Sequence, residues 1–225
     1  MYLLIILIAV AGWAVQARLK SKFREYGQQG LRANLRGREV AAKMLADNGI
    51  YDVQIISTEG SLSDHYDPTN KTVNLSADVY NERSVAAAAV AAHECGHAVQ
   101  HAQAYSFLKL RSAMVPALSS VSKVMPFILI AGIMLMRTTP IPLGIGIAMF
   151  ALITLFSFIT LPVEFDASRR ALAWMDRSGV VTTQEHAGAK DALWWAAMTY
   201  VVAALSSLAT LLYYVSIFMS GSRRN

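Results

Sequence analysis

The sequence has little cysteine and little charge, and each shortage narrows the class of protein. Its single cysteine, Cys95, excludes an internal disulfide. Charged residues make up 16% of the 225 residues, whereas an average globular domain contains about 25%. Hydrophobic residues make up 55%, and the mean hydropathy is +0.38. This composition favours the membrane class over an ordinary globular domain.

Acidic residues and histidines are missing from long parts of the chain. All fifteen Asp and Glu residues and all five histidines fall within residues 18–115 or 164–191. The remaining stretches are almost uncharged, which predicts two polar regions interrupted by membrane spans. None of the predicted spans contains an acidic residue or a histidine that could form an ion path, and this argues against a transporter.

Four apolar stretches are long enough to cross the roughly 30 Å of a bilayer's hydrocarbon. They cover residues 1–17, 117–136, 141–163 and 193–219. No Lys or Arg precedes the first stretch, and positive charges follow it from Arg18 onward, so we expect a retained anchor and no signal peptide. Twelve Lys and Arg residues lie in residues 18–115 and four in 164–191. The positive-inside rule therefore predicts a multi-pass protein of a cell membrane, which we expect to be bacterial, with both polar regions in the cytoplasm.

The polar region before the second span is predicted to contain helix and a small sheet. Residues 19–49 have apolar residues at helical spacing. Residues 53–56 and 72–75 look like short strands on either side of a turn-rich run. An edge strand can bind an extended substrate through backbone hydrogen bonds. The candidates for that edge are Thr72, Val73, Asn74 and Leu75; a purely structural hairpin fits equally well.

One short pattern is typical of zinc-binding sites: His93, Glu94 and His97 form an HExxH sequence. The alanine-rich run behind Ser84 predicts a helix, which places both histidines on one face. Both imidazoles can then bind one Zn²⁺, and Glu94 can act as general base on a zinc-bound water. The alternative is a helix with two surface histidines. Cys95 points away from the metal face, so we interpret it as a packing residue.

A catalytic zinc site needs a third protein ligand. Glu164 is the preferred candidate, because it follows the third span directly, where a carboxylate is costly unless paired or metal-bound. Asp166 is the rival and points to a different side of the helix. His101 lies too far along its helix to reach a metal held by the first histidine pair. His65 and His186 belong to no motif and are interpreted as ordinary polar residues.

These motifs, in their order, resemble one family over essentially the whole chain. The amino-terminal anchor and the runs at 63–68, 91–101 and 161–168 resemble the YugP-type membrane zinc metallopeptidases. More distantly, the layout is similar to the HtpX-like and CaaX-type membrane gluzincins. The resemblance implies that His93, His97 and Glu164 are zinc ligands and that Glu94 is the catalytic base. The HtpX-like pattern has an Asp four residues after the glutamate to support a ligand histidine, whereas this chain has Ser168.

We therefore expect a mainly α-helical integral membrane protein with four transmembrane helices and a small α+β gluzincin-like zinc peptidase unit. Residues 18–115 would hold the sheet and the HExxH helix, and residues 164–191 the third ligand. With one Zn²⁺ per chain, the protein would be an endopeptidase that cuts membrane or unfolded proteins near the membrane surface. Its basic residues 18–43 suit anionic headgroups, and no nucleic-acid partner is expected. The competing hypothesis is a non-hydrolytic, zinc-stabilised membrane scaffold or interaction protein, which needs no general base at Glu94.

Overall fold

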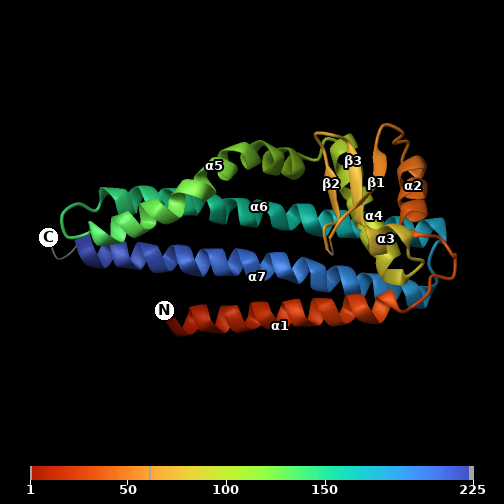
Figure 1. Ribbon diagram of the computed structural model, residues 1–225, viewed down its shortest axis with the longest axis horizontal. Coiled ribbons are helices and arrows are strands. Elements are labelled where there is room, and N and C mark those ends of the chain that lie inside the picture. Colours follow the sequence, from red (N-terminus) through yellow and green to blue (C-terminus); the bar gives the residue numbers. More distant parts are fainter. Residues whose placement is uncertain (1, 61, 223–225) are drawn as a thin grey trace. The chain divides into compact units, whose positions relative to one another are not determined.

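A computed structural model describes residues 2–60 and 62–222, and it is mainly helical with one small sheet (Figure 1). The chain divides into two compact units. The first comprises residues 2–14, 110–161 and 199–222, and the second comprises residues 15–109 and 162–198. Each unit is therefore built from segments that lie far apart in the sequence, because the long helices contribute residues to both units.

The first unit consists of apolar helices. Within the described residues, three helices are long and apolar enough to cross a membrane: α5 (Ser106–Met134), α6 (Ile141–Ser178) and residues Thr183–Ser220 of α7 (Thr183–Ser222). The span predicted over residues 1–17 lies in α1 (Tyr2–Gly27), apart from Met1, which is outside the described residues. Helix α1 is not among those three helices, so the membrane span over residues 1–17 stays a prediction.

Close helix contacts in the first unit depend on small residues. A methyl group added at Gly132 of α5 would lie 2.5 Å from the backbone of Leu143 in α6. Between α6 and α7, the hydroxyls of Thr154 and Ser207 are 2.7 Å apart and hydrogen-bond. Such small residues let apolar helices approach one another closely. Helix α5 contains Pro116 and Pro126 and changes direction along its length (Figure 1), as expected where proline interrupts backbone hydrogen bonds.

The second unit contains the sheet, whose strand order differs from the prediction. Strands β1 (Gln54–Thr58), β2 (His65–Asp67) and β3 (Thr72–Ser76) are arranged in the order β1-β3-β2. Strand β3 pairs with β1 in parallel and with β2 antiparallel. The predicted hairpin of the first and last strands is therefore wrong, because the run that looked like a turn contains β2.

The expected edge role of Thr72, Val73, Asn74 and Leu75 is also wrong. These residues form the central strand, whose two sides are occupied by β1 and β2. The side chains of Val73 and Leu75 are fully buried. Thr72, Val73 and Asn74 have a paired strand on both sides, so β3 does not offer a sheet edge to an added substrate strand there.

The predicted helix over residues 19–49 is interrupted. Helix α1 ends at Gly27, and α2 (Gly37–Asp47) begins ten residues later. In between, the amide of Leu31 donates to the carbonyl of Arg83 over 2.7 Å, and the amide of Val85 donates to the carbonyl of Gln29 over 2.9 Å. These bonds hold the connecting segment against residues 83–85, where the long helix α4 (Val85–Ala102) begins, and they exclude one continuous helix over residues 19–49.

That next long helix, α4 (Val85–Ala102), lies at the centre of the second unit, after the short helix α3 (Ala77–Asn81). Its alanines are almost all buried, so neighbouring elements pack close to its backbone. Cys95 is fully buried, and its thiol donates to the carbonyl of Ala41 in α2. Burial also raises the pKa of this thiol, which disfavours the thiolate that binds metals. The packing role predicted for Cys95 is therefore confirmed.

Gly96 allows α6 to approach α4. A methyl group at this position would lie 2.6 Å from the carbonyl oxygen of Ala167. We expect Gly96→Ala to lower the free energy of unfolding by about 1–3 kcal/mol, because the helices must separate to admit the methyl group. Chemical denaturation in detergent measures this effect. Gly30→Ala is the control, since a methyl group there meets nothing within 4 Å; equal stability of both variants would contradict the close packing.

Candidate metal centre

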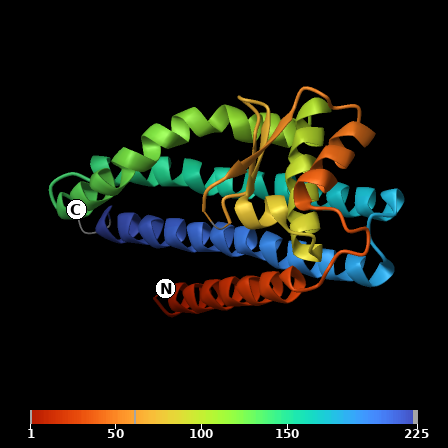
Figure 2. The ribbon, with the colours of Figure 1, turned by 45° about the vertical axis from the view of Figure 1, so that its right-hand side comes forward.

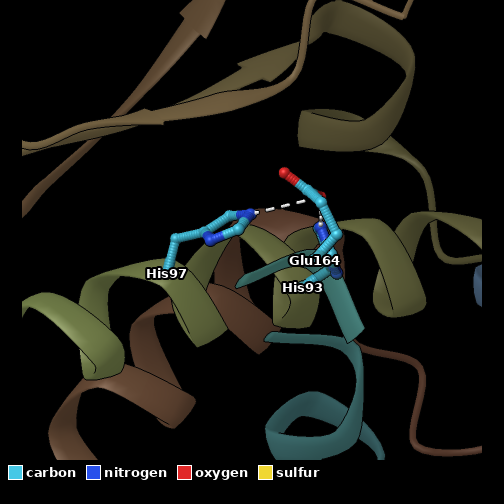
Figure 3. Close-up of side chains that lie close together, drawn as sticks. All are labelled: His93, His97 and Glu164. Atoms are coloured by element: carbon cyan, nitrogen blue, oxygen red, sulfur yellow. Dashed lines mark ion pairs between the residues drawn. The ribbon is translucent and has the colours of Figure 1, made fainter. Parts of the chain in front are cut away.

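Helix α4 presents the two motif histidines to α6 (Figure 3). The helix begins where the hydroxyl of Ser84 accepts a hydrogen bond from the amide of Ala87 over 3.1 Å, as the sequence pattern predicted. One helical turn separates His93 from His97, and their ring centroids are 4.8 Å apart. Both rings therefore point to one place, where they meet the side chain of Glu164 from α6.

The spacing of these three side chains fits a tetrahedral metal. The Oε2 atom of Glu164 lies 3.3 Å from Nε2 of His93 and 3.7 Å from Nε2 of His97. All three candidate ligand atoms lie within 4.8 Å of one another. Ligands about 2.0–2.1 Å from one tetrahedral zinc ion are roughly 3.3 Å apart. Two histidines and one carboxylate also form a donor set found in catalytic zinc sites.

A hydroxyl group supports the first histidine. Ser168 lies one turn beyond Glu164 in α6, and its Oγ atom is 3.1 Å from Nδ1 of His93. When Nδ1 of His93 carries the proton and donates it to this hydroxyl, Nε2 keeps its lone pair for a metal. Ser168 therefore takes the place of the Asp expected from the HtpX-like pattern.

An amide supports the second histidine, and sequence reasoning missed it. Gln100 is fully buried, and its Nε2 donates to the carbonyl of Val163 over 2.8 Å and to Asp166 over 2.9 Å. Its Oε1 is therefore the atom that faces Nδ1 of His97, at 3.0 Å, and accepts that proton's hydrogen bond. The available signal was the spacing, since Gln100 follows His97 by three residues on one helical face.

Asp166, the rival third ligand, has another role. Its carboxylate accepts hydrogen bonds from Gln100, Arg169 and Arg170, and it is not in the group that could hold a metal. The ion pair with Arg170 stabilises the charge of Asp166, so that Asp166 can hold the amide of Gln100 in place. This chain of contacts ends at Nδ1 of His97, whose other ring nitrogen, Nε2, faces Glu164.

The other histidines lie outside the candidate metal group. His101 is exposed, and its Nδ1 pairs with the hydroxyl of Tyr66 over 2.8 Å. His65 pairs with the carbonyl of Ser63, and His186 with that of Leu172. Among the described residues, the group that could hold a metal ion consists of His93, His97 and Glu164.

Glu94, the acidic residue of the HExxH sequence, is buried. Its side chain is buried on α4 between the two histidines of the motif. Burial raises the pKa of this carboxyl to about 7; the nearby His93 opposes the shift, and Glu164 adds to it. A general base is most effective when its pKa lies near the working pH. The carboxyl of Glu94 is a buried acidic group close to His93 and Glu164.

Comparison with known proteins agrees with this chemistry. A family described as "Putative neutral zinc metallopeptidase" matches residues 1–219. The chain belongs to this family. It is also 41% identical over 224 residues to the "Putative membrane protease YugP" of Bacillus subtilis (strain 168). The aligned region covers 100% of this chain and 98% of that protein. No solved structure matches this chain. The resemblance seen in the sequence motifs is confirmed, and membership of this zinc metallopeptidase family implies that the metal is zinc.

The amide network predicts a measurable effect on zinc binding in this family member. We expect Gln100→Leu to weaken zinc binding by about 10- to 100-fold, because His97 loses the acceptor that orients its ring. Competition with a chelator of known affinity measures the change. Gln184→Leu removes an exposed glutamine of α7 and serves as the control. Equal zinc affinity of the Gln100→Leu variant and the wild type would rule out the orienting role.

Proposed function

We propose that this chain is a membrane-embedded zinc endopeptidase in which Glu94 is the general base. The observation that carries the proposal is the convergence of His93, His97 and Glu164, with Glu94 buried on the same helix. One Zn²⁺ per chain would satisfy this ligand set. A scaffold protein could use the same ligands, but it would need no general base, and burying the further carboxyl group of Glu94 beside them costs free energy.

The chemistry follows from the positions of these side chains. When bound, zinc would polarise the scissile carbonyl and make a nearby water molecule more acidic. The carboxylate of Glu94 takes the proton of the attacking water and delivers it to the departing amine. Ser168 and Gln100 keep the rings of His93 and His97 in fixed orientations throughout.

We also assign the substrate-binding edge to β2 in place of β3. Strand β2 pairs with β3 on one side, and it is an end strand of the sheet. It lies against α4, where Tyr66 hydrogen-bonds His101. Asp64 and His65, at the start of β2, are close enough to Glu94 to influence its pKa. An extended peptide added to the free edge of β2 would therefore pass beside the catalytic helix.

The proposed substrates are membrane proteins or unfolded segments at the cytoplasmic membrane surface. Glu164 belongs to α6, one of the three helices able to cross a membrane. The relative from Bacillus subtilis is named a membrane protease. The distribution of Lys and Arg favours four spans, including α1, with the candidate metal centre in the cytoplasm.

Metal removal tests the proposed activity. We expect the detergent-purified chain to cleave an unfolded model protein, to lose this activity in a chelator, and to recover it with about one equivalent of zinc, because the candidate ligand set holds one ion. Gel electrophoresis and mass spectrometry of the products measure the cleavage. Cleavage that persists in the metal-free protein would contradict a zinc-dependent reaction.

A further inference from the structure

A cavity of about 540 Å³ lies beside α4 within the second unit. Its walls come from the carboxyl-terminal part of α1, from α3 and from the first half of α4, which lie near one another in Figure 2. The volume falls within the range of about 300–1,000 Å³ that is typical of ligand pockets. We call this space the α1–α4 cavity. Its apolar lining consists of Leu19, Phe23, Leu62, Val79, Ala86, Ala87 and Val90.

The α1–α4 cavity continues the face of α4 that carries the candidate catalytic residues. Val90 lines the cavity and precedes His93 by three residues, so both lie on one side of the helix. This separation corresponds to roughly 5 Å along the helix axis. Asp64, which directly precedes β2, also lines the cavity. A peptide whose scissile bond lies at Glu94 would place a neighbouring side chain in this space.

The chemistry of the lining indicates what kind of side chain fits. The three lining residues of α4 are all apolar, and α1 contributes the apolar side chains of Leu19 and Phe23. Lys20 and Arg24 contribute two positive charges, and three carboxylates, those of Asp64, Asp78 and Glu82, contribute three negative charges, so the lining holds charges of both signs in nearly equal number. The carboxylate of Asp64 is already engaged by the amide and hydroxyl of Ser76. A charged side chain would therefore meet like charges as well as opposite ones, whereas a large apolar side chain would be removed from water.

We propose that the α1–α4 cavity binds a large apolar side chain of the substrate next to the scissile bond, and that α1 is thereby part of the substrate-binding site. Helix α1 is held against α7 by Tyr26 and Lys22, which both contact Asp191. Leu19 and Phe23 are consequently fixed as one wall of the cavity. This inference rests on the proposed peptidase activity and adds a substrate preference to it.

The test is the cleavage of a mixed peptide library by the intact, detergent-purified protein. We expect the wild type to cut beside Leu, Phe or Met in preference to Ala. In Ala86→Leu, a side chain that fills the cavity should reduce kcat/KM for the large residues relative to Ala by about tenfold or more. In Phe23→Ala, a larger cavity should shift the preference in the opposite direction, towards Trp. The opposite shifts keep the test decisive if one variant folds poorly.

Phe107→Ala is the matched control, because Phe107 is a half-exposed aromatic residue of α5 that does not line the α1–α4 cavity. All variants are compared at equal zinc content and equal thermal stability. An unchanged preference in both cavity variants, with cleavage intact, would overturn the α1–α4 cavity as a substrate site and leave the peptidase standing. Absence of any cleavage that depends on Glu94 would instead overturn the proposed function, and the substrate preference with it.

Discussion

Glu94→Gln is expected to abolish proteolysis while leaving the bound metal in place. The amide has almost the same shape as the carboxylate but cannot accept the proton of the attacking water. A general base contributes about 10²- to 10⁴-fold to a rate, so kcat should fall by at least that range. Cleavage of an unfolded model protein, followed together with the zinc content of each preparation, measures the effect.

The zinc content decides how the result of Glu94→Gln is interpreted. Loss of activity with unchanged zinc would assign proton transfer to Glu94, because its carboxylate is not part of the ligand group. Equal cleavage by the variant and the wild type would contradict the mechanism and indicate a contaminating protease. The non-hydrolytic scaffold hypothesis predicts no cleavage by either protein, with zinc bound in both.

Glu164→Ala is expected to have the largest effect on the metal. Zinc sites in small domains bind with about 10–16 kcal/mol, or about 3–4 kcal/mol for each of four ligands. Loss of one ligand should therefore weaken binding by on the order of 10²- to 10³-fold. The substitution also removes the Glu164 carboxylate, which lies next to the buried His97 and would balance the metal's positive charge. Chelator competition measures the affinity of the variant against that of the wild type.

Two carboxylates of the same helix serve as comparisons for Glu164→Ala. Asp176 is exposed near the end of α6, and its replacement by Ala should leave zinc affinity unchanged. Asp166→Ala should have an intermediate effect, since Asp166 acts through Gln100 on His97. If Asp166→Ala weakened zinc binding more than Glu164→Ala, the assignment of the third ligand would be wrong.

The parts of the site that sequence predicted are those that depend on local geometry. The HExxH spacing places His93 and His97 on one face of any helix, and the alanine-rich run behind Ser84 makes that helix. Glu164 could be singled out because a carboxylate at the end of an apolar stretch needs a partner. The structure places its Oε2 atom within 4 Å of both histidines.

The parts that sequence did not predict depend on contacts between distant segments. Strand β2 lies in a run rich in turn-forming residues, and only its pairing with β3 makes it a strand. Because of that pairing, β2 is an end strand of the sheet, whereas Thr72 and its neighbours, the predicted edge, lie in the central strand. Gln100 is likewise one polar residue among many until α6 brings Val163 and Asp166 to its amide. Hydrogen bonds of this kind cannot be read from spacing along one helix.

X-ray absorption spectroscopy at the zinc edge of the purified chain tests the metal centre most directly. We expect about one zinc per chain with nitrogen and oxygen ligands at about 2.0–2.2 Å, two of them histidines, and no sulfur ligand at about 2.3 Å. The absence of sulfur is expected because Cys95 is buried against Ala41, away from the candidate metal position. A sulfur ligand, or a chain that retains no zinc, would contradict the site formed by His93, His97 and Glu164.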